Sequence, residues 1–315
     1  MDKKPRNWTS QYGENNIGNR LFLFILSVFG LKPAYFVLFF AGIQYALLDK
    51  KSKKAIKEFR TRLGLKTSFL DYYRHFYSFG MSLVDRYAYL LSGKDLFSYT
   101  FRREDIISSQ LARGKGVILL GAHMGNWEVA GNLLRQRLNA PINLLMYDVE
   151  SEEAKRLFSK AVNNRDVNVI FVTPDSPDST IQVMNALRRG EIICLHGDRC
   201  LENQRSEEIE FLGKNAPFPS GPFAVAAVTG AAVVPFFSIK TGWKHYTFRA
   251  FDPLIIESAS REERQNLIRA AMNKYIENLS SVAEEYPDQW YNFFSIWPPD
   301  QNEERITEPV LTPEM

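Results

Sequence analysis

The most apolar stretch of the chain lies near its N-terminus, over residues 21–48. It reads LFLFILSVFG, then Lys32-Pro33, then AYFVLFFAGIQYALL. The whole stretch is long enough to cross a bilayer, but the Lys-Pro pair predicts a break into two shorter segments. Neither segment reaches the roughly 18 to 20 apolar residues that a straight spanning helix needs. A secretory signal peptide fits poorly, because the apolar run is too long and no small-residue cleavage site follows it.

A basic cluster follows this apolar stretch directly. Its positive charges are Lys50, Lys51, Lys53, Lys54, Lys57 and Arg60. They outnumber the basic residues before the stretch, so a spanning segment would leave the rest of the chain in the cytoplasm. Near a membrane surface each such charge contributes about 1 kcal/mol of attraction to anionic headgroups. The pattern predicts membrane association. It does not distinguish a segment that spans the bilayer from one that dips into it or lies flat on it. The alternative is a buried helical hairpin of a soluble domain.

Residues 67–92 carry apolar and aromatic side chains at helical spacing. This pattern predicts one long amphipathic helix. Packing of its apolar face on the core is the favoured interpretation, and contact with an acyl chain or lipid is the alternative. His75 lies among these aromatic residues, and we interpret it as structural or surface-exposed, not catalytic.

From residue 116 onward, strand patterns alternate with helical ones. The predicted strands are 117–120, 142–147, 169–172, 191–195, 232–239 and 246–251, and the predicted helices are 126–139, 151–162, 177–189, 222–229 and 261–285. Such alternation predicts an α/β fold with a largely parallel sheet flanked by helices. Ligands of these sheets gather at the carboxyl ends of the strands, so the loops there are where chemistry is expected.

Composition narrows the range of functions. Apolar residues make up 45% of the 315 residues and charged residues 24%, which are ordinary values for a globular protein. A net charge of +3 is too small to indicate nucleic acid as the main partner. The two cysteines, Cys194 and Cys200, provide neither a disulfide framework nor metal-ligand spacing. A catalytic domain in a reducing compartment fits this composition.

The loop after the first buried strand, within VILLGAHMGNWEVAG, holds the most informative pair. His123 lies just past the strand end, and Asn126 is a predicted helix N-cap that places Glu128 in the first helical turn. A carboxylate folded back toward the imidazole would fix its tautomer and stabilise the protonated form, which general-base activation of a hydroxyl requires. From the spacing alone a structural role is favoured, and the position between a buried strand and a helix makes a catalytic role equally reasonable. As metal ligands the pair is incomplete, because no third His or Cys has suitable spacing.

Two later loops add candidate substrate contacts. Asp198 and Arg199 follow another strand end in LHGDRC, where Arg199 is a candidate for binding a phosphate or the developing oxyanion. His196 of this loop is a rival base, with Asp198 as its only obvious carboxylate partner. In FLGKNAPFPSGPF we expect a loop that leads into a small-residue helix, with Ser220 at its start and Lys214 contacting a donor or headgroup. Local ion pairing and helix–sheet packing are the structural alternatives.

In this order, the segments resemble the bacterial lipid A late acyltransferases, the lauroyl and myristoyl transferases, within the wider group of glycerolipid acyltransferases with a His-x-x-x-x-Asp/Glu motif. The resemblance covers most of the chain, through GAHMGNWE, HGDR, FLGKNAPFPSGP, TGAAVVP and DQWYNFFSIWPP. It implies that His123 is the general base and Glu128 its orienting partner. It also implies an acyl carrier protein or coenzyme A thioester as donor, a lipid or glycolipid hydroxyl as acceptor, and no cofactor or metal.

The resemblance implies four segments: a polar segment at 1–20, a hydrophobic membrane-associating segment with its basic flank at 21–66, the α/β acyltransferase domain at 67–300, and a polar tail at 301–315. It places the protein at the cell inner membrane with the catalytic domain facing the cytoplasm. The chain has Asp198-Arg199-Cys200 where the family often has Asp-Gln-Asp, and its aromatic C-terminal motif also differs. These departures leave the acceptor open. Rival interpretations are a lipid esterase that uses Ser220, and a lipid-binding protein without catalysis.

Overall fold

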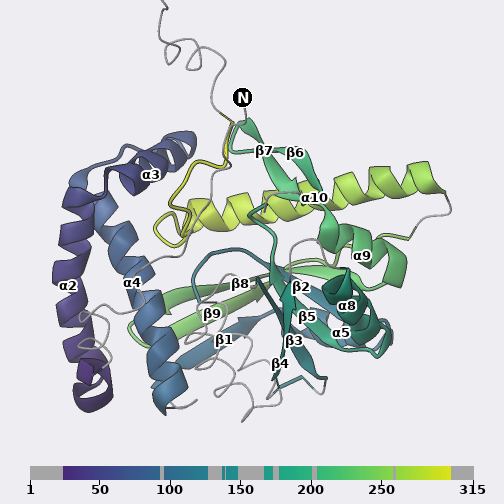
Figure 1. Cartoon of the computed structure of the whole chain (residues 1–315), viewed down its shortest axis with the longest axis horizontal. Coiled ribbons are helices and arrows are strands. Elements are labelled where there is room, and N and C mark those ends of the chain that lie inside the picture. Colours follow the sequence, from purple (N-terminus) through teal and green to yellow (C-terminus); the bar gives the residue numbers. More distant parts are fainter. Residues whose placement is uncertain are drawn as a thin grey trace, which may run out of the picture.

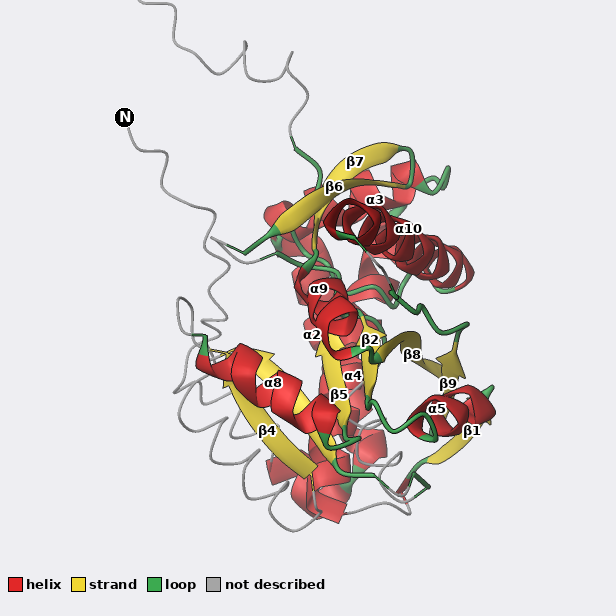
Figure 2. Ribbon diagram, turned by 90° about the vertical axis from the view of Figure 1, so that its right-hand side faces the viewer, coloured by secondary structure: helices red, strands yellow, loops and turns green. Residues whose placement is uncertain are grey.

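A seven-stranded mixed sheet forms the centre of the computed structural model, in the order β1-β9-β8-β2-β5-β3-β4 (Figures 1 and 2). The structure describes residues 24–92, 96–126, 137–138, 140–147, 167–172, 177–200, 204–257 and 260–298. The strands are β1 Ser98–Arg102, β2 Val117–Gly121, β3 Ile142–Tyr147, β4 Val167–Val172, β5 Ile192–His196, β8 Ala232–Gly242 and β9 His245–Ala250. All neighbouring pairs are parallel except β8 and β9. The predicted α/β fold with a largely parallel sheet is confirmed.

Buried side chains on both faces explain why β2 reads as an unbroken apolar run. Ile118 and Leu120 belong to a cluster with helices α8 Asp178–Arg188, α9 Gly221–Thr229 and α10 Arg261–Glu285. Val117 and Leu119 point the other way, into a cluster with α4 Phe69–Ser92 and α5 Glu104–Leu111. Parallel strands covered by helices on both faces bury alternate residues in opposite directions, so nearly every position is apolar. β2 is thereby held rigidly in the middle of the sheet.

The segment that we expected to be a loop, residues 211–220, is largely strand, so that prediction was wrong. β6 Ser206–Phe211 and β7 Lys214–Pro219 form a separate antiparallel hairpin. Leu212 and Gly213 connect them with positive φ angles of 52° and 80°, the backbone of a tight hairpin turn whose twist matches its strands. Prolines in β7 are tolerated because a two-stranded ribbon has free edges. The hairpin packs against α10 (Figure 1).

The N-terminal apolar stretch breaks at a different residue from the one predicted. Helix α2, Leu31–Leu48, runs through Lys32-Pro33, and Gly30 precedes it with a φ of 79°. Pro33 is accepted there because the first turn of a helix needs no backbone N–H donor, whereas Gly30 takes a backbone conformation that other residues avoid. Within the described part of the chain, α2 is the one helix long and apolar enough to cross a membrane.

Helix α2 lies beside α4, and α3 Lys50–Arg62 connects their ends (Figure 1). Ile56 and Phe59 of α3 are buried, while most of its lysines are exposed. The amphipathic helix predicted over residues 67–92 is confirmed as α4, and it packs on both α2 and the sheet. The outer face of α2 keeps large apolar side chains in solvent, among them Phe36, Phe40 and Leu48.

A buried ionic network connects α2 and α4 to the sheet. Lys240 of β8 pairs with Asp85 of α4, whose side chain is completely buried. The hydroxyl groups of Tyr35 on α2 and Tyr246 on β9 donate to the same carboxylate. A buried charge is stable only when it is paired and hydrogen-bonded, and removing one partner of such a pair costs about 3–5 kcal/mol. The network therefore fixes the position of α2 on the sheet.

Candidate active site

The loop that leaves β2 carries His123 at the carboxyl end of the sheet's central strand. Gly125 adopts a φ of 62°, and a Cβ atom there would lie 1.6 Å from the carbonyl oxygen of Ser238. Only glycine fits this approach, so the loop is pressed against β8. Tyr291 donates its backbone N–H to the His123 carbonyl at 2.7 Å, and Gly125 donates its own to Gln289 at 3.0 Å. The segment after α10 therefore holds the loop from the other side.

An imidazole–carboxylate dyad lies in this loop. Nδ1 of His123 is 2.8 Å from Oδ1 of Asp198, a residue 75 positions later that follows β5. β2 and β5 are parallel neighbours, so both loops emerge at the same end of the sheet. Because a carboxylate accepts, Nδ1 carries the proton and Nε2 is the acceptor nitrogen. One third of the His123 side chain is exposed, whereas Asp198 has no exposed surface.

Asp198 is held in the ionised state by its neighbours. Burial by itself would raise the pKa of this carboxyl, but the hydrogen bond from His123 and the charge of Arg199 outweigh burial and lower it. Oδ2 also accepts the backbone N–H of His123 and Nε1–H of Trp290, each at 3.0 Å. A fully bonded carboxylate keeps both its orientation and its charge. Asp198 can therefore stabilise a protonated His123 without taking its proton.

His123 is suited to be a neutral base at neutral pH. Burial lowers its pKa and the charge of Arg199 lowers it further, and together they exceed the opposing effect of Asp198. The pKa of His196 is also lowered, chiefly by burial and then by His123. Nδ1 of His196 lies 3.3 Å from Nε2 of His123. A hydroxyl that approaches Nε2 must take the place of this imidazole.

These side chains also form a possible metal cluster. One donor atom from each of His123, His196 and Asp198 falls within 4.8 Å of the other two. The sequence alone suggested no third ligand, and the structure supplies one in His196. Both oxygens of Asp198 already accept hydrogen bonds. The arrangement therefore fits a proton-transfer dyad better than a metal site.

Asn126 and Arg199, two other residues predicted for the site, lie near the dyad and donate hydrogen bonds to backbone carbonyl groups. The buried side-chain amide of Asn126 donates to the Ser82 carbonyl at 2.9 Å. The backbone carbonyl of Asn126 accepts from the Ser238 hydroxyl at 2.7 Å, so this residue fixes the loop between α4 and β8. Arg199 donates to the Tyr291 carbonyl at 2.6 Å, and burial lowers its pKa to about 10. Glu128 lies outside the described residues.

Lys214 and Ser220 make local contacts. The ammonium group of Lys214 donates to the Pro298 carbonyl at 2.7 Å, and the hydroxyl of Ser220 donates to the Arg205 carbonyl at 3.3 Å. Ser220 precedes α9 as expected, but its side chain forms no capping hydrogen bond with that helix. The structure thus brings His123, Asn126, Asp198 and Arg199 together around one loop.

Trp290 is a residue of the candidate site that sequence reasoning missed. Its indole N–H meets the dyad carboxylate, and its ring is buried between Phe59 and Phe211 at centroid distances of 4.7 and 5.4 Å. The motif DQWYNFFSIWPP was noted, but nothing in its spacing relates it to residue 198. Aromatic density late in the chain was the one available signal.

The profile of the bacterial lipid A biosynthesis acyltransferases matches residues 92–297, which contain the dyad and the segment that closes on it. The chain belongs to this family. Phosphatidylinositol mannoside acyltransferases are also similar: that of Mycobacterium tuberculosis is 26% identical over 208 residues, and that of Mycolicibacterium smegmatis 25% over 203 residues. The matches cover 64% of this chain and 60% and 63% of those proteins, so the chain spans somewhat under two thirds of their length.

Proposed function

We propose that this chain transfers a fatty acyl group from a thioester onto a hydroxyl group of a lipid or glycolipid. The observation that carries the proposal is the His123–Asp198 dyad, whose imidazole is one third exposed and has Nε2, next to His196, as its acceptor nitrogen. Membership of the lipid A biosynthesis acyltransferase family supports acyl transfer. The names of the mycobacterial relatives favour a glycolipid acceptor.

The dyad accounts for each proton in the proposed reaction. Nε2 of His123 accepts the proton of the acceptor hydroxyl while the oxygen attacks the thioester carbonyl. Asp198 stabilises the imidazolium that results. Collapse of the tetrahedral intermediate breaks the carbon–sulfur bond, and the imidazolium returns its proton to the departing thiolate. The products are an ester and a free thiol on the donor, which we expect to be acyl carrier protein or coenzyme A.

Asp198, and not only Glu128, is a proposed partner of the base. The family resemblance assigns orientation to Glu128, and that assignment stays a prediction. The hydrogen bond to Nδ1 comes from the loop after β5. A Glu128→Gln variant with normal activity would leave Asp198 as the sole orienting carboxylate.

We also propose that the protein works at the cytoplasmic face of the inner membrane. Support comes from the exposed apolar side chains of α2 and from the exposed lysines of α3 that follow it. An apolar surface beside a basic one is typical of segments that bind anionic bilayers. Such attachment would bring a lipid acceptor to His123.

Acyl transfer by the purified full-length protein tests the proposal. We expect detergent-solubilised protein, given labelled acyl carrier protein or acyl coenzyme A and a bacterial lipid extract, to move the label into a lipid. His123→Ala should abolish transfer, whereas His245→Ala, which removes a histidine at the start of β9 and outside the dyad, should retain it. Release of free fatty acid instead would indicate the esterase, and absence of any product, or full activity of His123→Ala, would contradict the mechanism.

A further inference from the structure

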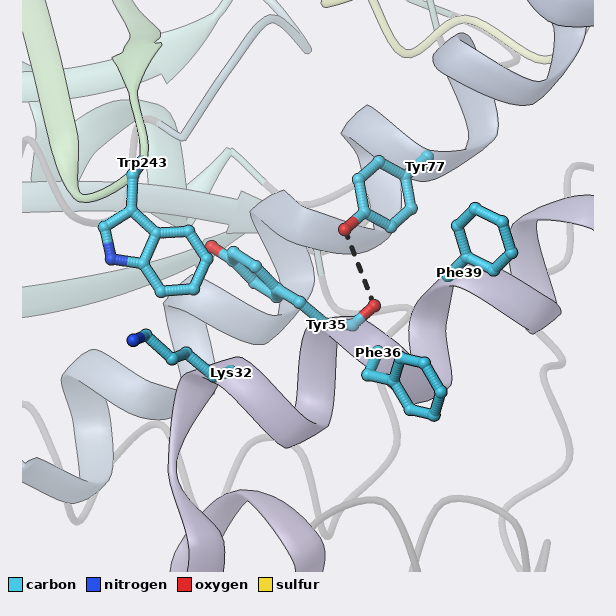
Figure 3. A pocket seen from close by; sticks show the side chains of 6 residues that line it. All are labelled: Lys32, Tyr35, Phe36, Phe39, Tyr77 and Trp243. Carbon is cyan, nitrogen blue, oxygen red and sulfur yellow. Dashed lines mark hydrogen bonds between the residues drawn. The ribbon is translucent and has the colours of Figure 1, made fainter.

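An aromatic groove lies between α2, α4 and the turn that joins β8 to β9 (Figure 3). Its volume is about 730 Å³, and it is lined by Lys32, Tyr35, Phe36, Phe39, Tyr77 and Trp243. Pockets for single small ligands fall in the range of roughly 300–1,000 Å³. The lining does not include the dyad residues, which lie in the loops after β2 and β5.

The two ends of the groove differ in chemistry. Lys32 and Trp243 lie at one end, and Phe36 and Phe39 project at the other (Figure 3). Trp243 is 47% exposed and Phe36 is 67% exposed. A cation with an indole at one end and apolar rings at the other matches an amphiphile that has a negative headgroup. Tryptophan and lysine are also the residues that anchor proteins at the level of the lipid headgroups.

The floor of the groove is built before any ligand arrives. The ring of Tyr35 meets Trp243 edge-on at a centroid distance of 5.0 Å, and its hydroxyl is fixed by Asp85 in the buried network. Tyr77 donates a long hydrogen bond of 3.5 Å to the Tyr35 carbonyl. A preorganised site loses little conformational freedom when a ligand binds.

The charges around the groove select the ligand. Lys32 is exposed, and within the described part of the chain no carboxylate forms an ion pair with it. The exposed lysines of α3 follow the other end of α2 and do not line the groove, so Lys32 is the cation that faces a ligand there. Among membrane components, a lipid with a net negative headgroup is therefore favoured over a zwitterionic one.

We propose that this groove binds one anionic phospholipid of the bilayer, with its phosphate at Lys32 and an acyl chain across Phe36 and Phe39. The inference rests on the membrane association proposed above, but it is independent of acyl transfer. The bound lipid would cover the contact between Tyr35 of α2 and Trp243 of the β8–β9 turn. It would thereby hold the sheet at a fixed height against the membrane.

Native mass spectrometry of the full-length protein released from detergent tests this site, with dioleoyl phosphatidylglycerol and dioleoyl phosphatidylcholine as probes. We expect one phosphatidylglycerol to be retained per chain, and phosphatidylcholine to be retained about tenfold less. Lys32→Glu should weaken retention of phosphatidylglycerol about tenfold, because attraction at the phosphate becomes repulsion. Phe36→Ser should weaken both lipids alike. No acyl donor is present, so the result does not depend on whether the chain is a transferase.

Lys54→Glu is the matched control, because it reverses one exposed charge on α3 outside the groove. It should leave single-lipid retention unchanged. Equal retention of the two lipids, equal loss in Lys54→Glu and Lys32→Glu, or lipid-free dimers in which a second chain covers the groove would each overturn the proposal. Circular dichroism of every variant separates loss of the site from loss of the fold.

Discussion

At the scale of single residues, the dyad depends on side chains that lie far apart in the sequence. The His123 imidazole owes its tautomer to Asp198, and Asp198 owes its orientation to Trp290. The first hydrogen bond joins the loop after β2 to the loop after β5, and the second joins the loop after β5 to the segment after α10. The chemistry of the site is therefore only as rigid as the packing that keeps these loops together.

Replacing Asp198 with Asn should reduce turnover by on the order of 10²- to 10⁴-fold while the protein stays folded. An amide in this position can fix the wrong tautomer of His123 and cannot stabilise the imidazolium. Asp105→Asn, on the exposed first turn of α5, is the matched control and should leave turnover unchanged. Steady-state acyl transfer measures the effect, and a wild-type rate for Asp198→Asn would exclude Asp198 from the mechanism.

His75 makes stability sensitive to acid. Burial lowers its pKa from 6.5 to about 3. The unfolded chain takes up a proton as the pH falls through 6.5, and the folded chain does not, so the free energy of unfolding should fall with decreasing pH. One such group contributes a loss of about 1.4 kcal/mol per pH unit below 6.5. The lowered pKa values of His123 and His196 add to the effect in the same direction.

Urea denaturation between pH 7 and pH 5 measures this dependence. His75→Phe should reduce the slope of unfolding free energy against pH by about one proton, whatever its effect on stability at pH 7. The comparison variant is His245→Phe, which removes the partly exposed histidine at the start of β9. The same slope in wild type and His75→Phe would contradict the assignment.

Sequence reasoning at this scale proposed His123 as the base but did not predict that Asp198 and Trp290 hold it in place. A histidine just past a buried strand, with glycines around it, predicts a site because strand ends meet there. Asp198 was predicted to belong to the site but not to be the partner of His123. The pairing of β2 with β5 cannot be inferred from the spacing of the two residues in the sequence. Glu128 was preferred on spacing and resemblance, and its role is still a prediction.

At the scale of elements, the loop after β2 is shaped by one close approach. Gly125→Ala should destabilise the protein severely and abolish acyl transfer, because the new Cβ meets the Ser238 carbonyl at 1.6 Å and the backbone keeps a left-handed φ. Gly190→Ala is the matched control, since its φ of 80° is similar but nothing lies within 4 Å of its Cβ. That change should cost only about 1–2 kcal/mol. Thermal unfolding distinguishes the two, and similar losses would contradict the steric explanation.

Regular elements were largely predictable because their patterns are strong. β3 at residues 142–147 and α10 at residues 261–285 begin and end where predicted. Several elements were not predicted. β1 has only exposed and half-buried residues, and α5 is only eight residues long, so their patterns are weak. β7 contains prolines, which usually exclude a strand. The predicted helices over 126–139 and 151–162 fall almost wholly outside the described residues.

At the scale of the whole molecule, the membrane-facing layer is joined to the sheet through buried charge. Lys240→Met should lower the free energy of unfolding by about 3–5 kcal/mol, because Asp85 is left charged and buried without its partner. The double variant Lys240→Met/Asp85→Asn should recover part of the loss, since no uncompensated charge remains. Denaturant unfolding of Lys240→Met, Asp85→Asn and the double variant measures this. A double variant that is less stable by the sum of the two single losses would argue against a coupled pair.

The arrangement of the N-terminal helices and the sheet could be predicted only in part from the sequence. An α/β sheet with an apolar N-terminal layer was predicted from hydrophobic pattern, and both are present. The break at Gly30 was misassigned to Pro33 because proline inside a helical pattern usually ends a helix, and its harmless position in the first turn depends on where the helix starts. The ion pair between α4 and β8 was not predictable, since Lys240 and Asp85 are 155 residues apart.

Residues 289–291 bear on how the protein matures in the cell. They form hydrogen bonds with the loop after β2 and with the Asp198 carboxylate, and they are translated long after the strands that precede His123 and Asp198. A ribosome that has just made β5 holds a chain in which both dyad residues exist but nothing locks them. The arrangement of the dyad is therefore complete only after the late aromatic segment emerges and docks, so a half-synthesised chain would lack the hydrogen bonds that hold His123 and Asp198 in place.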